Sequence, residues 1–179
     1  MSLVGIDVGS SSVKVGACSD QGELIGVASW DLTPLHPAPG LWETDPEDIW
    51  HATTQAMRHL VQQDAVRRDP PRALAVSASG RENFPADAQG MPLGNGIMGA
   101  DTRGAEFEIP PEGAPVPEPW CVSCGHLRER MDPIFRLAWW RKYHPEIMEQ
   151  ARYFFGWIDF LAYRMTGRAV MDQSTVSRY

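Results

Sequence analysis

The sequence predicts an α/β fold, in which a mixed sheet begins with an antiparallel meander and is flanked by helices. Residues 3–28 contain three short apolar segments separated by turns rich in Gly, Ser and Asp, a pattern typical of strands joined by tight turns. A helical segment and a fourth apolar segment, over residues 73–78, follow. That order favours a strand parallel to the first, reached through a right-handed crossover.

The composition is compatible with one sizeable core and argues against several kinds of partner. The chain has 179 residues, of which 43% are hydrophobic, and a formal net charge of −7. It contains no apolar run long enough to span a membrane, and no basic segment leads into an apolar stretch at its start. We therefore expect a cytoplasmic protein without nucleic-acid or membrane partners. Formation of a homo-oligomer is compatible with this composition.

The opening segment is the first candidate site. Residues 3–16 read Leu-Val-Gly-Ile-Asp-Val-Gly-Ser-Ser-Ser-Val-Lys-Val-Gly, which predicts strand, tight turn and strand. Such a turn presents backbone N–H groups, hydroxyls and a lysine beside a carboxylate, which can cradle phosphate oxygens and hold Mg²⁺. We assign the ion to Asp7, directly or through water. We assign phosphate binding to Gly9, Ser10, Ser11 and Lys14. Many hairpins without a ligand carry a similar turn.

A connector over residues 33–40 leads into the first helix. Asp45 is the expected N-cap and Pro46 the first helical residue, and the helix should end before residues 69–71. Residues at helical spacing should pack on the sheet. They are Ile49, Thr53, Ala56, Met57, Leu60 and Val61. Residues 73–78 then predict a buried strand.

The turn after that strand is the second candidate site. Arg81 and Glu82 would lie at the carboxyl end of the strand, where open α/β sheets bind ligands. A guanidinium that donates and a carboxylate that accepts suit the adjacent hydroxyls of a sugar or polyol. The alternative is a solvated ion pair at the surface.

Two further groups of residues have both a structural and a binding interpretation. Residues 94–100 predict another strand, after which Asp101 and Arg103 fit the N-cap and first turn of a helix. Among the tryptophans, Trp42 follows a Pro-Gly connector and could contact a sugar or cover the edge of the sheet. The helical spacing of Trp50, Trp139 and Trp157 favours the core.

The second half of the chain predicts two helices and a long loop. Amphipathic patterns place the helices over residues 133–143 and 157–166, and a proline-rich loop spans about 109–132. Cys121 and Cys124 form a lone CxxC in that loop. A zinc site would need two more ligands at suitable spacing, so we interpret them as ordinary loop cysteines and assign no metal there.

Taken in order, these segments resemble the FGGY family of carbohydrate kinases. The resemblance is carried by the opening turn and by residues 39–50, 87–93, 101–103, 159–167 and 172–178. It implies a ribonuclease H-like (actin-like ATPase) fold that is incomplete. Residues 1–179 would be the amino-terminal part of the first domain, and the second, nucleotide-binding domain would be absent.

The resemblance also implies an activity. It implies transfer of the γ-phosphoryl group of ATP, with Mg²⁺, to a hydroxyl of a sugar or polyol, most simply a ketopentose or a polyol. Arg81 and Glu82 would grip the acceptor, and Asp101 and Arg103 would organise the sugar side. Gln173 stands where glycerol kinases carry a Tyr that contacts the polyol, and Gly99 where the family usually carries Trp. The general base, an Asp, would lie beyond residue 179, so this chain alone should be inactive.

Two other functions remain open at this point. One is another ATPase of the actin-like superfamily, which would hydrolyse ATP without a sugar. The other is a non-catalytic module that binds a sugar or regulates a partner through Arg81 and Glu82. Sugar binding without nucleotide binding would favour this second alternative.

Overall fold

The computed structural model describes residues 1–107, 132–177 and 179, and these form two units. Unit 1 consists of Met1–Leu35 and Thr44–Ser79, and unit 2 of His36–Glu43 and Gly80–Tyr179. Most of the predicted proline-rich loop, with Cys121 and Cys124, lies outside the described residues.

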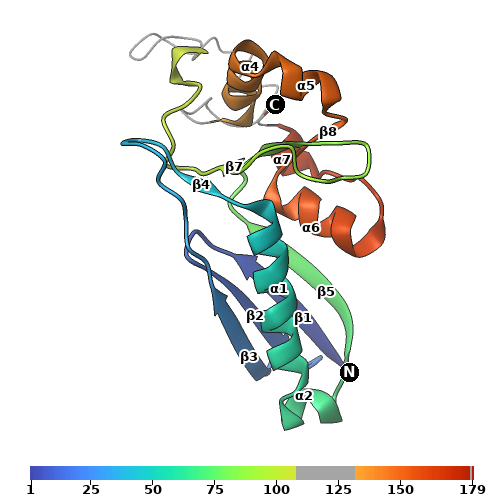
Figure 1. Cartoon of the computed structure of the whole chain (residues 1–179). Coiled ribbons are helices and arrows are strands. Elements are labelled where there is room, and N and C mark those ends of the chain that lie inside the picture. The colour runs from blue at the N-terminus through green and yellow to red at the C-terminus, as the bar shows by residue number, and fades with distance from the viewer. Residues whose placement is uncertain (108–131, 178) are drawn as a thin grey trace, which may run out of the picture. The chain divides into compact units, whose positions relative to one another are not determined.

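Unit 1 is built on a four-stranded sheet (Figure 1). Its strands are β1 (Ser2–Val8), β2 (Ser12–Cys18), β3 (Leu24–Asp31) and β5 (Pro71–Ala78). The order is β3-β2-β1-β5, with β1 antiparallel to β2, β2 antiparallel to β3, and β1 parallel to β5. The predicted meander and the predicted parallel strand are therefore confirmed.

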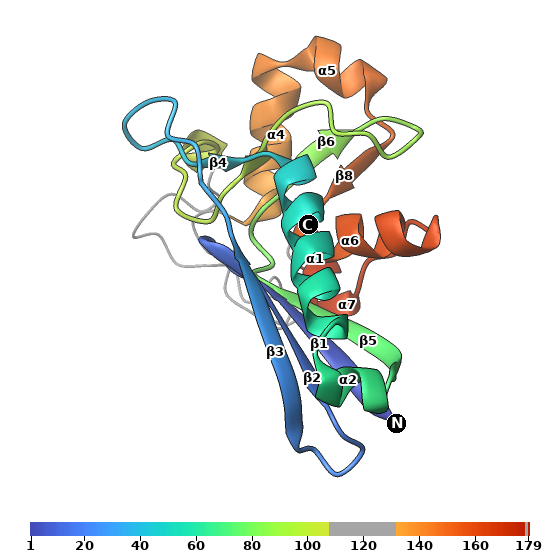
Figure 2. The same cartoon turned by 60° about the horizontal axis from the view of Figure 1, so that its bottom comes forward.

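One face of this sheet is buried and the other is open. Along β1 the side chains of Val4, Ile6 and Val8 are buried, whereas Leu3 and Asp7 on the other face are exposed. Helix α1 (Pro46–Val61) packs across β2 and β3 on the buried face (Figure 2). The alternation of apolar and polar residues in the sequence thus produces a one-sided core.

Helix α1 begins as predicted and ends earlier than predicted. The Asp45 side chain accepts a hydrogen bond from the Glu47 N–H at 2.9 Å, which caps the helix. The helix stops at Val61, which is 43% exposed, and α2 (Asp64–Arg68) follows. The segment after α1 packs closely on β3, since a Cβ on Gly26 would lie 2.7 Å from Val66 and from the Gln63 side chain.

Strand β5 is paired as predicted, but the prediction that it is buried is wrong. All of its residues are exposed or half-buried, and Leu74 is 46% exposed. Two features explain this. The strand lies at the edge of the sheet in the described part of the chain, and α1 contacts β2 and β3 rather than β5. An apolar run alone does not distinguish an edge strand from a central one.

Unit 2 contains short strands and four helices among its described residues. The strands are β6 (Phe84–Ala86), which pairs antiparallel with β8 (Tyr153–Phe155), and β7 (Gly96–Ile97), which pairs with β4 (Glu43–Thr44). The helices are α4 (Pro133–Tyr143), α5 (Pro145–Gln150), α6 (Trp157–Thr166) and α7 (Gln173–Val176), with a 3-10 turn, η1 (Ala105–Phe107). Helices α4 and α6 have the predicted limits. The predicted strand over residues 94–100 is reduced to β7. Within the ranges that the structure covers, no helix is long and apolar enough to cross a membrane.

Three glycines in the loop before and within β7 each lie against an aromatic ring. The glycines are Gly90, Gly94 and Gly96, and the rings are those of Tyr163, Trp140 and Trp157, respectively. A Cβ on Gly96 would lie only 2.2 Å from the Trp157 ring, which is 2% exposed. Trp157 is thus a core residue as predicted, whereas Trp50 and Trp139 are only half-buried. The loop packs tightly because these positions have no side chain.

Candidate functional site

The opening turn joins β1 to β2 and is closed by a short hydrogen bond. The Gly9 N–H donates to the Ser12 carbonyl at 3.0 Å, and a Cβ on Gly9 would lie 3.2 Å from that same oxygen. Glycine therefore permits the tight turn, and its N–H is used within it. Ser10 and Ser11 are exposed, and no hydrogen bond among the described residues uses their N–H groups. These two amides and hydroxyls are available to a ligand.

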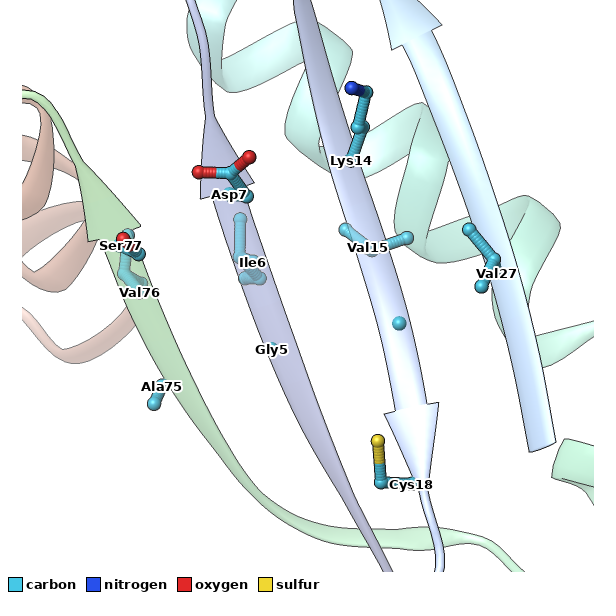
Figure 3. A pocket seen from close by; sticks show the side chains of 11 residues that line it. Gly5, Ile6, Asp7, Lys14, Val15, Cys18, Val27, Ala75, Val76 and Ser77 are labelled. Atoms are coloured by element: carbon cyan, nitrogen blue, oxygen red, sulfur yellow. The ribbon is translucent and has the colours of Figure 1, made fainter. Parts of the chain in front are cut away.

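Asp7 and Lys14 flank this turn on the open face of the sheet. They lie directly opposite each other in the register of β1 and β2, and both side chains are exposed. In the part of the chain that the structure describes, neither forms an ion pair. Figure 3 shows them on neighbouring strands at one end of a hollow. A carboxylate and an ammonium group are thus held side by side without neutralising each other by contact.

The hollow beside them has a volume of about 440 Å³, and several small residues are among those that line it. Gly16, Gly5 and Ala75 are neighbours across β2, β1 and β5, so few side-chain atoms project from the sheet along this row. Cys18 lines the end away from Lys14, and Val27 lies on β3 beside the hollow (Figure 3). A ligand at the turn therefore has room over the sheet next to Asp7.

This set of groups fits a phosphate and Mg²⁺. Mg²⁺ prefers oxygen ligands and keeps several water molecules, so one exposed carboxylate beside phosphate oxygens suffices. The described residues contain no group of three or more His, Cys, Asp or Glu that could enclose a metal ion. Asp7 would consequently hold the ion together with water and phosphate, and Lys14 with the two serines would contact phosphate oxygens.

In unit 2 the structure brings Trp42, Asp101 and Arg103 together. Asp101 is fully buried, and its Oδ2 accepts a hydrogen bond from the Trp42 N–H at 2.6 Å. The Arg103 guanidinium donates to Asp101 Oδ1 at 2.9 Å and Oδ2 at 2.6 Å, and to Glu43 Oε1 at 2.7 Å. Glu43 Oε2 also accepts from the Asn95 amide at 2.8 Å. The connector before β4 is thereby joined to the segment after β7.

The electrostatics of this ion-pair network favour its charged form. Burial by itself would raise the pKa of Asp101, but the Arg103 guanidinium and two backbone N–H groups outweigh it and hold the pKa below its usual value. Burial likewise opposes the charge on Arg103, whose pKa is nevertheless raised by hydrogen bonds to Asp101 and Glu43. Arg103 also lies over the Trp139 ring at 5.1 Å.

These contacts and the local backbone bear on one of the two interpretations of Asp101 and Arg103, the helix cap. No α-helix follows Asp101 within residues 102–107, where only η1 forms, so the predicted N-cap is wrong. Both carboxylate oxygens of Asp101 are engaged, and they fix the backbone of Trp42 and Arg103. Trp42 is 39% exposed and lies edge-on to His36, with 4.0 Å between the ring centroids. Asp101 and Arg103 thus support the position of Trp42.

Arg81 and Glu82 form a second group in unit 2. Arg81 is half-buried and Glu82 is 6% exposed, so Glu82 is more enclosed than the surface ion pair of the alternative interpretation. A Cβ on Gly99 would lie 3.4 Å from Glu82 Oε1 and 3.8 Å from the Arg81 Cβ. The absence of a side chain at position 99 therefore leaves space next to both residues.

One buried residue beside this group was missed by the sequence reasoning. Arg136 on α4 is 0% exposed, and its guanidinium donates to the carbonyls of Arg81 and Met98. The signal was present in the sequence, because the arginine stands between Phe135 and Trp140 on the apolar side of the predicted helix 133–143. A charged residue there is unusual unless it has a partner.

Gln173 is not brought together with the other candidates by any contact among the described residues. It is the first residue of α7 and is exposed. The preceding Asp172 caps this helix by accepting hydrogen bonds from the N–H groups of Ser174 and Thr175. Hydrogen bonds from their hydroxyls, followed by those from their N–H groups, lower the pKa of Asp172 to about 2. Residues 172–175 of that motif thus form a local helix cap.

A model of the N-terminal domain of the FGGY family of carbohydrate kinases matches residues 2–179. The xylulose kinase of Escherichia coli (strain K12) is 35% identical over 175 residues, which are 96% of this chain and 34% of that protein. The glycerol kinase of Thermococcus onnurineus (strain NA1) is 28% identical over 182 residues, which are 98% of this chain and 36% of that protein.

Solved structures show the same fold. The xylulose kinase from Rhodospirillum rubrum has a TM-score of 0.88 at 20% identity, covering 99% of this chain and 36% of that one. The glycerol kinase of Plasmodium falciparum with ADP has a TM-score of 0.82 at 19% identity, covering 99% and 37%. These likenesses confirm the predicted ribonuclease H-like, actin-like ATPase fold. The chain spans about a third of the length of the curated relatives that it matches.

Proposed function

The chain belongs to the FGGY family of carbohydrate kinases, and we propose that the whole protein transfers the γ-phosphoryl group of ATP to a hydroxyl of a sugar or polyol. The observation that carries the proposal is the opening turn of unit 1. There an exposed carboxylate, an exposed lysine and two unused N–H groups converge beside a hollow. The cytoplasm, where ATP and Mg²⁺ are abundant, is the location that follows from it.

In unit 1, catalysis would rest on positioning and charge neutralisation. Lys14, Ser10 and Ser11 would hold phosphate oxygens, and Gly9 would give the turn the shape it needs. Asp7 would hold Mg²⁺, which when bound neutralises the charge on the phosphate oxygens. During transfer an acceptor oxygen bonds to the γ-phosphorus, the bond from that phosphorus to the bridging oxygen breaks, and ADP leaves. The proton of the acceptor hydroxyl passes to a base.

In unit 2, Arg81 and Glu82 would orient the acceptor. A guanidinium donates to, and a carboxylate accepts from, neighbouring hydroxyls, which suits a molecule with adjacent hydroxyl groups. Trp42 would present its exposed ring to the carbon side of the acceptor, held there by Asp101 and Arg103. The relatives are named xylulose and glycerol kinases, which supports a ketopentose or a polyol as the acceptor.

The test is an assay of ADP formation by the full-length gene product with Mg-ATP and a panel of ketopentoses and polyols. We expect ADP formation that depends on one of these acceptors. Arg81→Ala should raise the acceptor KM and lower kcat, because Arg81 would contact the acceptor in the ground and transition states. Arg72→Ala is the matched control, since Arg72 is exposed on β5 in unit 1 and has no assigned role.

Two outcomes would contradict the proposal and identify its alternatives. ADP formation that no acceptor stimulates would indicate an ATPase of the actin-like superfamily. Binding of a sugar without any binding of nucleotide would indicate a non-catalytic binding module. Unchanged acceptor kinetics in Arg81→Ala would remove this residue from the site while leaving the activity in place.

A further inference from the structure

Arg136 is a charged side chain buried in the interior of unit 2. It lies on α4 and is 0% exposed, beside the buried residues Phe135 and Trp140. Burying a charge is costly unless hydrogen bonds and opposite charges compensate it. The contacts that compensate Arg136 therefore indicate what it does for the protein.

Those contacts are backbone carbonyls from two different turns. One Nη donates to the Arg81 carbonyl, and the other donates to the Met98 carbonyl at 2.7 Å and to the Gly99 carbonyl at 3.4 Å. The first turn carries Arg81 and Glu82, and the second leads directly into Asp101. A single guanidinium thus bridges the two segments that hold the candidate acceptor residues.

The chemistry of the bridge requires arginine. A guanidinium is a planar fork whose two Nη atoms point to separate acceptors, whereas the ammonium group of lysine is a single point charge. The charged groups facing Arg136 are the carboxylates of Asp101 and Glu82, which favour its charge, and the guanidinium groups of Arg103 and Arg81, which oppose it. Burial lowers the pKa of Arg136 to about 10, so it stays protonated at neutral pH.

We propose that Arg136 is a positioning residue of the acceptor site, which fixes the Arg81–Glu82 turn and residues 98–101 at one separation. The inference rests on the proposed function, because it concerns how the acceptor hydroxyls meet their partners. Arg136 itself contacts backbone, and its effect on the acceptor is exerted through these two turns. Gly99, whose carbonyl it binds, is also the position that leaves space beside Glu82.

The experiment compares Arg136→Lys and Arg136→Met in the full-length protein with Arg141→Met as the control. Arg141 is exposed on the same helix and has no assigned role. For each protein we would measure the KM for the acceptor and for Mg-ATP, the Tm, and amide hydrogen exchange of peptides covering residues 80–83 and 98–101. The acceptor for the assay is the one that the panel above identifies.

We expect Arg136→Lys to raise the acceptor KM by about tenfold or more, because small displacements of positioning groups have large kinetic effects. The KM for Mg-ATP should stay within about twofold, and exchange should accelerate in both turns. Arg141→Met should change none of these. If Arg136→Met does not fold, Arg136→Lys, which keeps the charge, still tests whether Arg136 positions the acceptor site.

Four results would overturn the inference. Equal changes in the KM for acceptor and for Mg-ATP would show that Arg136 only stabilises the fold, as would a lower Tm with both KM values unchanged. An unchanged acceptor KM in an active Arg136→Lys protein would refute the positioning role while leaving the proposed function intact. A wild-type protein without any acceptor-dependent turnover would refute the proposed function, and the inference with it.

Discussion

The two units hold their candidate residues in opposite ways. In unit 1, Asp7 and Lys14 come from one hairpin, are exposed, and form no ion pair in the described part of the chain. In unit 2, Asp101 is buried and Arg103 half-buried, and the guanidinium joins Asp101 to Glu43, which is 60 residues away from Arg103 in the sequence. The first arrangement leaves polar groups available, and the second uses them to hold backbone in place.

This difference separates binding from positioning by a measurable criterion. An exposed charge adds little to stability, so its replacement should affect a ligand and spare the fold. A buried charge in a network cannot be removed without leaving its partner uncompensated. Stability measurements on matched pairs of variants, one in each unit, therefore test the assignment of each residue.

The largest loss of stability is expected for Arg103→Met. Asp101 is 0% exposed, so its carboxylate would remain buried without its guanidinium partner, at a cost of about 3–5 kcal/mol in the free energy of unfolding. Urea denaturation at neutral pH measures it. Because the pKa of Asp101 is lowered in the folded wild type, the carboxylate stabilises the fold above its unfolded pKa, and the loss should shrink as the pH falls through the folded pKa.

Replacement of the exposed Arg168 by Met in the same unit is the control for this experiment. If Arg103→Met lowers the free energy of unfolding by less than about 1 kcal/mol, the Asp101–Arg103 pair contributes no more than an exposed salt bridge. That result would contradict the described burial of Asp101.

A smaller loss is expected where a glycine is replaced under a buried ring. In Gly96→Ala the new Cβ would lie 2.2 Å from the Trp157 ring, so the ring must move, and we expect a loss of about 3 kcal/mol. Gly5→Ala in unit 1 is the matched change, since nothing lies within 4 Å of a Cβ there. It should be neutral or raise stability by up to about 1 kcal/mol. Thermal unfolding of the two variants measures the contrast, and equal Tm values would refute it.

Asp159 of unit 2 should make stability depend on pH. It is 1% exposed, its Oδ2 accepts from the Gly156 N–H at 2.9 Å, and burial raises its pKa to about 6. The folded state then binds the proton more tightly than the unfolded state, so stability should fall as the pH rises from about 4 to about 6. Asp159→Asn should abolish this fall and raise stability at pH 7 by about 2 kcal/mol.

Urea denaturation between pH 4 and pH 7 measures this effect, with the exposed Glu149→Gln as the control. An unchanged pH dependence in Asp159→Asn would show that another group is responsible for it.

Features that depend on neighbouring residues could be read from the sequence. The limits of α4 and α6 were predicted because their apolar spacing is local, and Pro133 stands at the start of α4. The meander was predicted because each strand alternates and each turn carries its own signal. The opening turn, as a candidate site, lies entirely within one hairpin.

Features that depend on contacts between segments distant in the sequence could not be predicted from local patterns. The apolar run of β5 fits both a central and an edge strand, and only the packing of α1 on β2 and β3 decides. The spacing of Asp101 and Arg103 fits a helix cap, and the contacts with Trp42 and Glu43 come from a distant connector. The role of Arg136 depends on the carbonyls of two turns that are distant from α4 in the sequence, so no local pattern could predict these contacts.

The smallest effect on stability is expected for Lys14→Met in unit 1. Lys14 is exposed and its ammonium group forms no ion pair among the described residues, so the free energy of unfolding should change by less than about 0.5 kcal/mol. In the full-length protein the same change should raise the KM for Mg-ATP, because the lysine would contact phosphate oxygens, and should leave the acceptor KM unchanged. Arg136→Lys should show the opposite pattern, with the acceptor KM changed and that for Mg-ATP preserved. If Lys14→Met lowers the free energy of unfolding and leaves the kinetics normal, this lysine stabilises the fold and does not bind phosphate. The exposed charges of unit 1 would then not differ in role from the buried charges of unit 2.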